Sequence, residues 1–514
     1  MSNISILGLS GSLRNARFRR GSQSLSREIA GIENELDLTA YLVTQTKIRA
    51  DDFLEAGLSS GAPFDQVYRA LHKRRFERGL SNSEAATATA LWAAHRAGAG
   101  ISHIGLAEHF PPNGPVREPQ RLAAALRAAD GIIVSSPVYF GDRGSLVQSL
   151  FEFIASDPGL KRDMAGKIYG GLAVGAKRNG GQETTLIYQM LDMLNMGLLA
   201  VGNGHETTAQ YGGTAKAGDV GTFASDQYGL QTCIGTGRRV ARTALMRSMS
   251  ENGAALADKL SIHLWLVQDS EDGRGHRYFQ NWANDLRGRD PSVDVRIFDA
   301  VNDEVVRCLA CEVCPTRLGE GRDYRCIVTS ADDFFVKHHG ELLDADAILM
   351  AAYCPENHAK TKSVYQQFME RTRYLRRDNY VFEDLLVAPF VVGPVETGQN
   401  LHIRAAGSMI RHHTVLSRPL LGFETNGQLL NAAALAADSD VFLARSRELL
   451  VGRYLLNKEE TEYRPVGYQI SAAKAREDQA SGRMTDMIRL RQADHNATAH
   501  GRLGLLNSGS NSRG

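Results

Sequence analysis

The fold is decided by the stretch Ala129-Asp130-Gly131-Ile132-Ile133-Val134-Ser135-Ser136-Pro137-Val138-Tyr139-Phe140-Gly141, in which an apolar run leads directly into a turn. Residues 132–134 are β-branched and apolar, which is typical of a strand that is buried on both faces of a parallel sheet. Pro137 and Gly141 end this strand. In an open α/β sheet the ligand crevice lies beyond the carboxyl ends of the strands. We therefore expect the backbone amides of residues 137–141 to face a ligand.

A second signal lies near the amino terminus, where the apolar strand Ile4–Leu9 ends in Ser10-Gly11-Ser12-Leu13-Arg14. Glycine lets a backbone approach an anion closely, hydroxyl and N–H groups donate hydrogen bonds, and arginine supplies positive charge. The segment is a candidate phosphate loop. Taken alone, a strand end rich in serine and glycine is more often a plain turn.

Together, and in this order, the two loops resemble those of the flavodoxin-like NAD(P)H-dependent FMN reductases. That superfamily includes quinone reductases and iron-sulfur flavoproteins. Two further segments fit it: a strand at 167–175, followed by Arg178-Asn179-Gly180-Gly181-Gln182-Glu183, which is similar to the family's GGQE loop, and a last strand at 198–202. The resemblance covers about residues 1–250 and implies an FMN-binding domain there.

One departure from the family is large. The family's phosphate loop continues directly into Ser-Asn-Thr and a helix, whereas here the counterpart is Ser81-Asn82-Ser83-Glu84. Residues 15–80 are therefore interpreted as an insertion after the first strand. Ser81 or Ser83 can cap the alanine-rich helix that follows, and a helix N-terminus favours phosphate. The basic residues of the insertion fit a solvated surface, a lid over the flavin, or a site for an anionic substrate.

Composition indicates an ordinary globular enzyme. The 514 residues are 43% hydrophobic and 23% charged, and the formal net charge of +1 gives no global basic field for nucleic acid. No apolar run is long enough to cross a membrane, and the amino terminus is predicted to be a core strand and not a signal peptide. We expect a cytoplasmic protein without nucleic-acid or membrane partners.

The second half of the chain repeats the pattern of the first. Apolar strands are predicted at 260–267, 294–298, 345–352 and 385–393, and Ala345-Asp346-Ala347-Ile348-Leu349 matches Ala129-Asp130-Gly131-Ile132-Ile133 closely. An internal duplication is the simplest interpretation. The predicted fold class is α/β, with two tandem flavodoxin-like, doubly wound parallel-sheet domains at 1–250 and 258–455.

The second copy lacks the flavin loops. Its counterpart of the phosphate loop is Gln268-Asp269-Ser270-Glu271-Asp272-Gly273-Arg274, whose three carboxylates would repel phosphate. We interpret this domain as a degenerate copy that serves as a scaffold, an interface or a wall of the substrate pocket. Residues 456–514 form a polar tail that we expect to be partly disordered.

Four of the six cysteines form the pattern Cys308-x2-Cys311-x2-Cys314-x11-Cys326 in the second half. Clustered thiols suit metal or redox chemistry. The pattern resembles the cysteine motif of iron-sulfur flavoproteins, but its last spacing is longer. The alternatives are no metal, an iron-sulfur cluster, structural zinc, or a reactive thiol pair.

The resemblance implies an FMN-dependent oxidoreductase that takes hydride from NADH or NADPH and passes electrons to a specialised small-molecule acceptor. The alternatives are an iron-sulfur flavoprotein electron carrier and a flavin-binding interaction protein without activity. Family members form oligomers, so a homodimer is expected. Tyr139 and Glu183 are the catalytic candidates. The implied cofactor-binding residues are Ser10, Ser12, Leu13, Arg14, Ser81, Asn82, Ser83, Pro137, Val138, Tyr139, Phe140, Gly141, Gly175, Asn179, Gly180 and Gly181.

Overall fold

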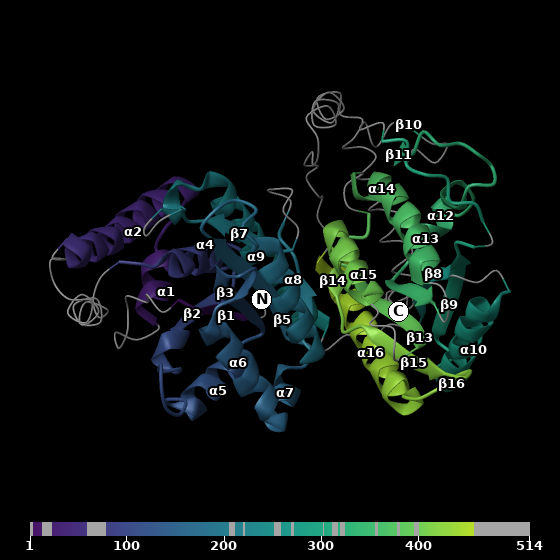
Figure 1. The fold of residues 1–514 in the computed structure, drawn as a ribbon, viewed down its shortest axis with the longest axis horizontal. Helices are drawn as coiled ribbons and strands as arrows, with labels where there is room; N and C mark the ends of the chain where they lie inside the picture. Colours follow the sequence, from purple (N-terminus) through teal and green to yellow (C-terminus); the bar gives the residue numbers. More distant parts are fainter. Residues whose placement is uncertain are drawn as a thin grey trace, which may run out of the picture. The chain divides into compact units, whose positions relative to one another are not determined.

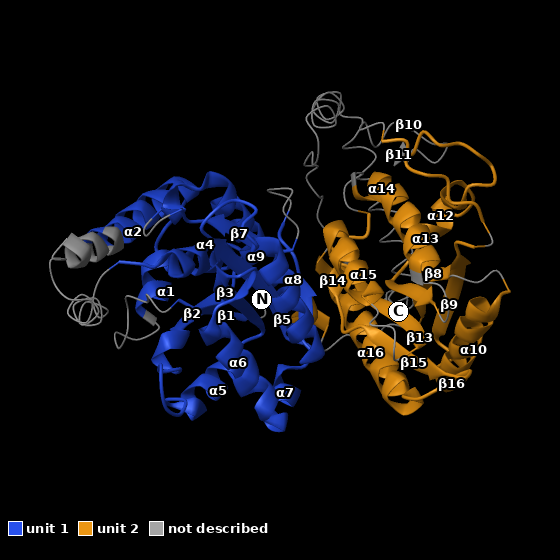
Figure 2. Cartoon of the chain, in the orientation of Figure 1, with its two compact units in different colours: residues 1–245 blue, residues 246–514 orange. Residues whose placement is uncertain are grey.

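The structure is a computed structural model that describes most of the 514 residues. The described residues are 4–12, 23–58, 79–204, 211–218, 222–250, 259–268, 272–301, 303–310, 317–318, 324–354, 358–377, 381–394 and 400–456. The chain divides into two compact units, Met1–Leu245 and Met246–Gly514 (Figure 2). The predicted tail after residue 456 lies outside the described residues. The same holds for the basic residues of the insertion on which the lid and anion-site interpretations depend: Arg17, Arg19, Arg20, Lys73, Arg74, Arg75 and Arg78.

Unit 1 is built on a parallel sheet. Its strands are β1 (Ser5–Ser10), β2 (Gly100–Gly105), β3 (Gly131–Tyr139), β5 (Ile168–Gly175), β6 (Leu199–Val201) and β7 (Gly213–Lys216). The order is β2-β1-β3-β5, and both β6 and β7 pair with β5 in parallel. In chain order this is the second strand, then the first, third, fourth and fifth, which is the flavodoxin-like order.

Helices cover both faces of this sheet (Figure 1). They are α4 (Asn82–Arg96), α5 (Pro119–Ala128), α6 (Ser145–Ser156), α7 (Pro158–Met164), α8 (Gln182–Asn195) and α9 (Gln227–Ser250). On one face, a Cβ built on Gly170 would lie 2.5 Å from Val240 of α9; on the other, a Cβ on Gly171 would lie 2.9 Å from Leu186 of α8. The interior strand β5 is consequently buried along its whole length. The predicted α/β class is confirmed.

The described part of the insertion forms two helices, α1 (Gln23–Ala30) and α2 (Glu35–Leu58). They pack beside α4 and α9. The indole nitrogen of Trp92 donates to the carbonyl of Ile32 at 2.9 Å, and Glu35 accepts from Gln231 at 2.9 Å. This position leaves α1 and α2 on the flank of unit 1.

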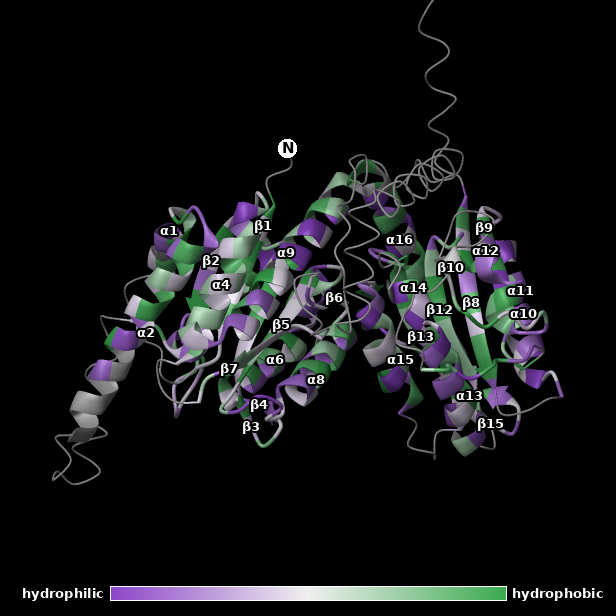
Figure 3. Ribbon diagram, turned by 90° about the horizontal axis from the view of Figure 1, so that it is seen from above, coloured by the Kyte–Doolittle hydropathy of each residue, from purple (hydrophilic) through white to green (hydrophobic). Residues whose placement is uncertain are grey.

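Unit 2 has its own parallel sheet, formed by β8 (Leu260–Gln268), β9 (Val293–Asp299), β12 (Ala347–Tyr353), β13 (Leu386–Pro394), β14 (Val415–Leu416) and β15 (Leu420–Thr425). Its order is β9-β8-β12-β13, with β14 and β15 both parallel to β13, so the chain order again reads second, first, third, fourth and fifth. Figure 3 shows strands such as β8 and β12 as hydrophobic along most of their length.

The longer helices of unit 2 are α10 (Arg274–Arg289), α13 (His358–Arg371), α15 (Leu401–Met409) and α16 (Ala432–Leu456). Shorter elements complete it: α11 (Phe334–Lys337), α12 (His339–Leu342), α14 (Arg373–Arg377), η6 (Ile410–His412), the hairpin strand β16 (Gln428–Leu429), and the antiparallel pair β10 (Arg317–Leu318) and β11 (Tyr324–Arg325). In the described part of the chain, no helix combines the length and apolar character needed to span a membrane.

Each unit contains the same pair of hydrogen bonds between its first strand and the aspartate that precedes its third strand; we call this pair the serine–aspartate clasp. In unit 1 the Ser5 N–H donates to the Asp130 carboxylate at 2.8 Å, and the Asp130 N–H donates back to the Ser5 carbonyl at 2.8 Å. In unit 2 the Ser261 N–H donates to the Asp346 carboxylate at 2.8 Å, and the Asp346 N–H donates back at 2.9 Å. The same residue types therefore make the same two hydrogen bonds at the same strand ends.

Candidate functional site

The first wall of the site follows β1. Gly11 donates its N–H to the Ser135 carbonyl at 2.8 Å, and a Cβ on Gly11 would lie only 2.4 Å from Val147 of α6. Only glycine fits this crossing without displacing the helix. Ser10 does not face the site, because it is fully buried and its hydroxyl is hydrogen-bonded to His103 Nε2 at 2.9 Å. Leu13 and Arg14 lie outside the described residues.

The second wall is the N-terminus of α4. Ser81 is the N-cap and forms a capping box with Glu84: the Glu84 N–H donates to Ser81 Oγ at 3.3 Å, and the Ser81 N–H donates to the Glu84 carboxylate at 2.8 Å. The N–H groups of the first turn of a helix are not satisfied by the helix itself. They point out of the helix end, which is the arrangement that favours an anion.

The third wall is the hairpin between β3 and β4 (Asp142–Arg143). Phe140 and Gly141 form its two-residue loop with φ of 52° and 78°, as a tight turn with a left-handed backbone requires. Gly144 donates its N–H to Ser136 Oγ at 2.9 Å. Tyr139 is half-exposed and Phe140 fully exposed, so both rings stand at the surface.

Arg143 of this hairpin contacts both α6 and α8. Its guanidinium lies 2.5 Å from the Asp192 carboxylate of α8, donates to Gln148 of α6 at 2.8 Å, and stacks 4.7 Å from the centre of the Phe151 ring. The hairpin is thus fastened to both helices that flank it.

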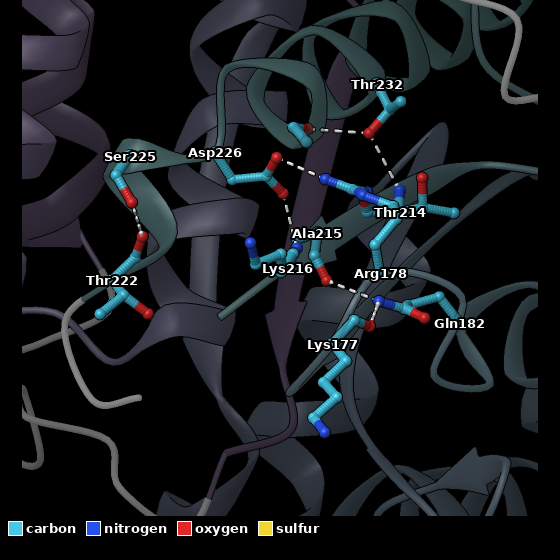
Figure 4. A network of polar contacts seen from close by, with 11 residues as sticks. Lys177, Arg178, Gln182, Thr214, Ala215, Lys216, Thr222, Ser225, Asp226 and Thr232 are labelled. Carbon is cyan, nitrogen blue, oxygen red and sulfur yellow. Dashed lines mark hydrogen bonds and ion pairs between the residues drawn. The ribbon is translucent and has the colours of Figure 1, made fainter. Parts of the chain in front are cut away.

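The fourth wall is the loop between β5 and α8, whose backbone is hydrogen-bonded to Gln182, the first residue of α8 (Figure 4). Gln182 donates to the Lys177 carbonyl at 2.7 Å and to the Ala215 carbonyl at 3.2 Å, and it accepts from the Gly180 N–H at 2.7 Å. Asn179 and Gly181 have positive φ. A Cβ on Gly181 would lie 2.8 Å from the Gly141 Cα, so the loop packs against the hairpin.

These walls enclose one pocket of about 340 Å³ at the carboxyl ends of β1, β3 and β5. Eight predicted residues line it: Ser12, Ser81, Asn82, Ser83, Pro137, Val138, Tyr139 and Gly175. Ser10, Phe140, Gly141, Asn179, Gly180 and Gly181 are not among the lining residues, although the last five build the adjoining turns. Glu183 is exposed in the first turn of α8. No lining residue comes from α1 or α2.

Gly11 lies within the predicted phosphate loop and Ala176 within the predicted loop after the strand at 167–175. Sequence reasoning missed the rest of the lining: Gly144, Ser145, Leu146, Val174 and Ala217. A signal existed for residues 144–146, since a glycine before an apolar helical run marks a helix N-terminus. A second helix end, that of α6, therefore opens into the pocket. No sequence pattern indicated Ala217 as a lining residue, because its position depends on β7, a short strand that the sequence did not predict.

The buried Glu84 and the partly buried Glu108 are close enough to interact electrostatically. Burial raises the pKa of Glu108 to about 7; Glu84 and Glu118 raise it further, while Arg121 opposes the shift. Burial likewise lowers the pKa of the neighbouring His109 imidazole. Glu84, which caps the helix at the pocket, thus belongs to a group of coupled charges.

The cysteine pattern is described only in part. Cys308 and Cys326 are half-buried and form no disulfide, and Cys311 and Cys314 lie outside the described residues. Among the residues that the structure describes, no three potential ligands gather around one point. Cys326 lines a small hollow with Phe335, His339, Arg371 and Tyr374. The metal assignment stays a prediction.

Comparison with known proteins gives a match to the same region. Residues 77–209 match the family model of NADPH-dependent FMN reductase. An iron-sulfur flavoprotein of Methanocaldococcus jannaschii is 38% identical over 117 residues, which is 23% of this chain and 59% of that protein. An iron-sulfur flavoprotein of Methanosarcina thermophila is 32% identical over 116 residues, 22% of this chain and 56% of that protein.

An NAD(P)H dehydrogenase (quinone) of Caulobacter vibrioides is 31% identical over 127 residues, which is 23% of this chain and 63% of that protein. The chain thus spans about three fifths of the length of these curated relatives. The matched residues include the second, third and fourth walls of the pocket. Residues 77–209 of the first unit are thus similar to the NADPH-dependent FMN reductases.

Proposed function

We propose that unit 1 binds one FMN in this pocket, takes hydride from NADH or NADPH, and passes electrons to a specialised small-molecule acceptor. The observation that carries the proposal is the pocket itself, which has the N-terminus of α4 at one end and the hairpin of β3 and β4 at the other. Its volume lies within the roughly 300–1,000 Å³ typical of cofactor sites. FMN, when bound, supplies the electron-transfer chemistry, and the protein binds and orients it.

The phosphate end of the pocket fits a phosphate group. The hydroxyls of Ser12, Ser81 and Ser83 lie around the α4 N-terminus, and Gly11 keeps the backbone close. The capping box uses the N–H groups of Ser81 and Glu84, and we assign the end of α4 at Asn82 and Ser83, which line the pocket, to the phosphate. Leu13 and Arg14 remain proposed contacts on sequence grounds.

The ring end fits a flat group. Pro137, Val138 and Tyr139 form one side of it, and Gly175 and Ala176 form the other, so that much of the wall is backbone or small side chain. Phe140, Gly141, Asn179, Gly180 and Gly181 are assigned to shaping these turns. Tyr139 stands at the rim and is the nearer of the two catalytic candidates; Glu183 would act from the first turn of α8.

We further propose that the chain is a tandem of two flavodoxin-like domains, about 1–250 and 258–455, of which the second is degenerate. The shared strand order and the repeated serine–aspartate clasp support a duplication. The loss of the phosphate loop after β8 supports a second unit without flavin. A homodimer of chains remains part of the proposal by analogy with the family.

The acceptor is proposed to be a small molecule, and the name of the Caulobacter relative favours quinones as its class. A second candidate function is favoured by the names of the two archaeal relatives, which are iron-sulfur flavoproteins. In that case Cys308, Cys311, Cys314 and Cys326 would hold a cluster that exchanges single electrons with FMN.

The purified full-length chain tests these proposals through its visible spectrum and its flavin content. We expect one FMN per chain, bleached anaerobically by NADH or NADPH. Iron and acid-labile sulfide with added broad absorbance would favour the second candidate. A chain that binds no FMN after reconstitution would overturn both.

The variant Asn82→Asp tests the phosphate end. A carboxylate in the first turn stabilises a helix but repels a phosphate, so folding should persist while FMN binding weakens at least tenfold, on the order of 1–2 kcal/mol. Riboflavin, which lacks the phosphate, should bind unchanged. The matched control is Asn284→Asp on the exposed face of α10. Equal FMN affinity in Asn82→Asp and wild type would contradict the assignment.

A further inference from the structure

A short segment between β7 and α9 is bonded to both ends of the pocket. Its core is η3 (Phe223–Ser225). The Phe223 N–H donates to Asn82 Oδ1 at 3.2 Å, and Asn82 is a lining residue at the phosphate end. Three residues later, the Asp226 carboxylate accepts from the Lys216 N–H at 2.6 Å and pairs with the Arg178 guanidinium (Figure 4).

The partners of Asp226 belong to the ring end. Arg178 follows Gly175 and Ala176 in the chain, and Lys216 directly precedes Ala217. Gly175, Ala176 and Ala217 all line the pocket. The Ala217 N–H also donates to the Gly175 carbonyl at 2.8 Å, which brings these two rim segments side by side. The Asp226 carboxylate therefore fastens both of them.

The connection between the two anchors is stiff. Asp226 donates its N–H to the Phe223 carbonyl at 2.9 Å, and Ser225 donates both its N–H and its hydroxyl to Thr222, at 3.1 and 2.7 Å. One helical turn therefore separates the contact with Asn82 from the contact with Arg178. A displacement at one anchor is transmitted to the other, since a hydrogen-bonded turn has little freedom to absorb it.

The ion pair between Arg178 and Asp226 is partly shielded from solvent. The Arg178 and Asp226 side chains are 32% and 10% exposed, and the guanidinium also donates to the Thr214 carbonyl at 2.6 Å and lies 4.8 Å from the centre of the Tyr228 ring. Space for the carboxylate is provided by Gly229, where a Cβ would lie 2.2 Å from Asp226 Oδ2. A partly buried pair with fixed geometry contributes more than a surface pair.

We propose that Asp226 is a positioning residue that couples the ring end of the pocket to its phosphate end; this inference rests on the proposed FMN site. Through Arg178 and Lys216 it sets the rim that faces the ring. Through η3 it sets the position of Asn82 at the phosphate. Loss of its charge should loosen both ends together and reduce the preference of the pocket for FMN over riboflavin.

The experiment measures FMN and riboflavin dissociation constants for wild type, Asp226→Asn and Asp226→Glu, together with the midpoint potential of bound FMN. Asparagine keeps the volume and an acceptor for Lys216 but loses the ion pair. We expect FMN binding to weaken about tenfold and riboflavin binding about threefold in Asp226→Asn, with a shifted potential. Asp226→Glu should restore part of the preference. A second variant, Arg178→Gln, removes the pair from the other side and should act in the same direction.

The matched control is Asp163→Asn, which removes a comparable arginine partner, Arg127, on the surface away from the pocket. It should leave both dissociation constants unchanged. An unchanged FMN-to-riboflavin ratio and potential in Asp226→Asn and Arg178→Gln, with normal binding by wild type, would overturn this inference alone. A wild-type chain that binds neither flavin would overturn the proposed function, and the inference with it.

Discussion

Replacement of Glu108 by glutamine should make unit 1 more stable at alkaline pH and leave it unchanged at acid pH. Burial is the main cause of the raised pKa of this carboxyl, about 7 in place of 4.5. A carboxyl whose pKa is raised by folding binds its proton more tightly in the folded state. Its contribution to stability is therefore complete below about pH 4.5 and is lost as the pH rises through about 7.

The size of the effect follows from that shift. A difference of this size corresponds to roughly 3 kcal/mol of unfolding free energy, at about 1.4 kcal/mol for each pH unit. The Glu108 side chain is 14% exposed and lies 3.9 Å from Arg121, so solvent screening reduces the expected gain of Glu108→Gln at pH 8 to about 2 kcal/mol. At about pH 4.5 the variant and wild type should be equally stable.

Urea unfolding followed by tryptophan fluorescence measures this difference, because Trp92 is buried in α4 of unit 1. The matched control is Glu152→Gln, an exposed position on α6 that should change the unfolding free energy by less than about 0.5 kcal/mol at every pH. A stability difference between Glu108→Gln and wild type that is constant with pH, or a less stable variant at pH 8, would refute the reasoning.

Two further substitutions probe packing and buried charge. Gly11→Ala forces a Cβ to within 2.4 Å of Val147 and should lower the free energy of unfolding by about 1–3 kcal/mol and abolish FMN binding. The control Gly31→Ala has no close neighbour and should change neither property. Calorimetry measures the stability and flavin titration measures the binding. In unit 2, Asp333→Asn leaves the fully buried Arg371 without its bidentate partner and should cost about 3–5 kcal/mol in a urea titration. The double variant Asp333→Asn with Arg371→Met should recover much of that loss, and a double variant no more stable than the single one would contradict the explanation.

The strands that could be predicted from the sequence are those whose side chains are apolar on both faces. Residues 132–134 and 168–175 read as buried strands because helices cover both sides of the sheet, and both predictions hold. β2 was missed. It is an edge strand with Ser102 and His103 in its middle, and such a mixed run has no clear period.

The site was predictable where local chemistry determines it and not where distant contacts do. Ser81 caps α4 as its residue type suggests. The prediction that Pro137 ends the strand is wrong, because β3 continues through Pro137 to Tyr139 and only Phe140 and Gly141 form the turn. The inward orientation of Ser10 depends on His103, a residue on another strand. The role of Asp226 depends on Arg178, and no local pattern links the two. Pairings of this kind arise only when the sheet assembles.

The split phosphate loop has a consequence for how this pocket forms during folding. Ser12 and Ser81 line the same pocket, but α1 and α2 lie between them in the chain, held by the Trp92–Ile32 bond and by a bond of 3.1 Å from the Leu80 N–H to the Gln45 carbonyl. Closing such a long loop adds only about 0.6 kcal/mol for each doubling of its length. Contacts between residues far apart in the chain do, however, slow folding. We therefore expect the length of the insertion to affect the rate at which the pocket forms more than the final free energy, as long as both of its ends still reach α4.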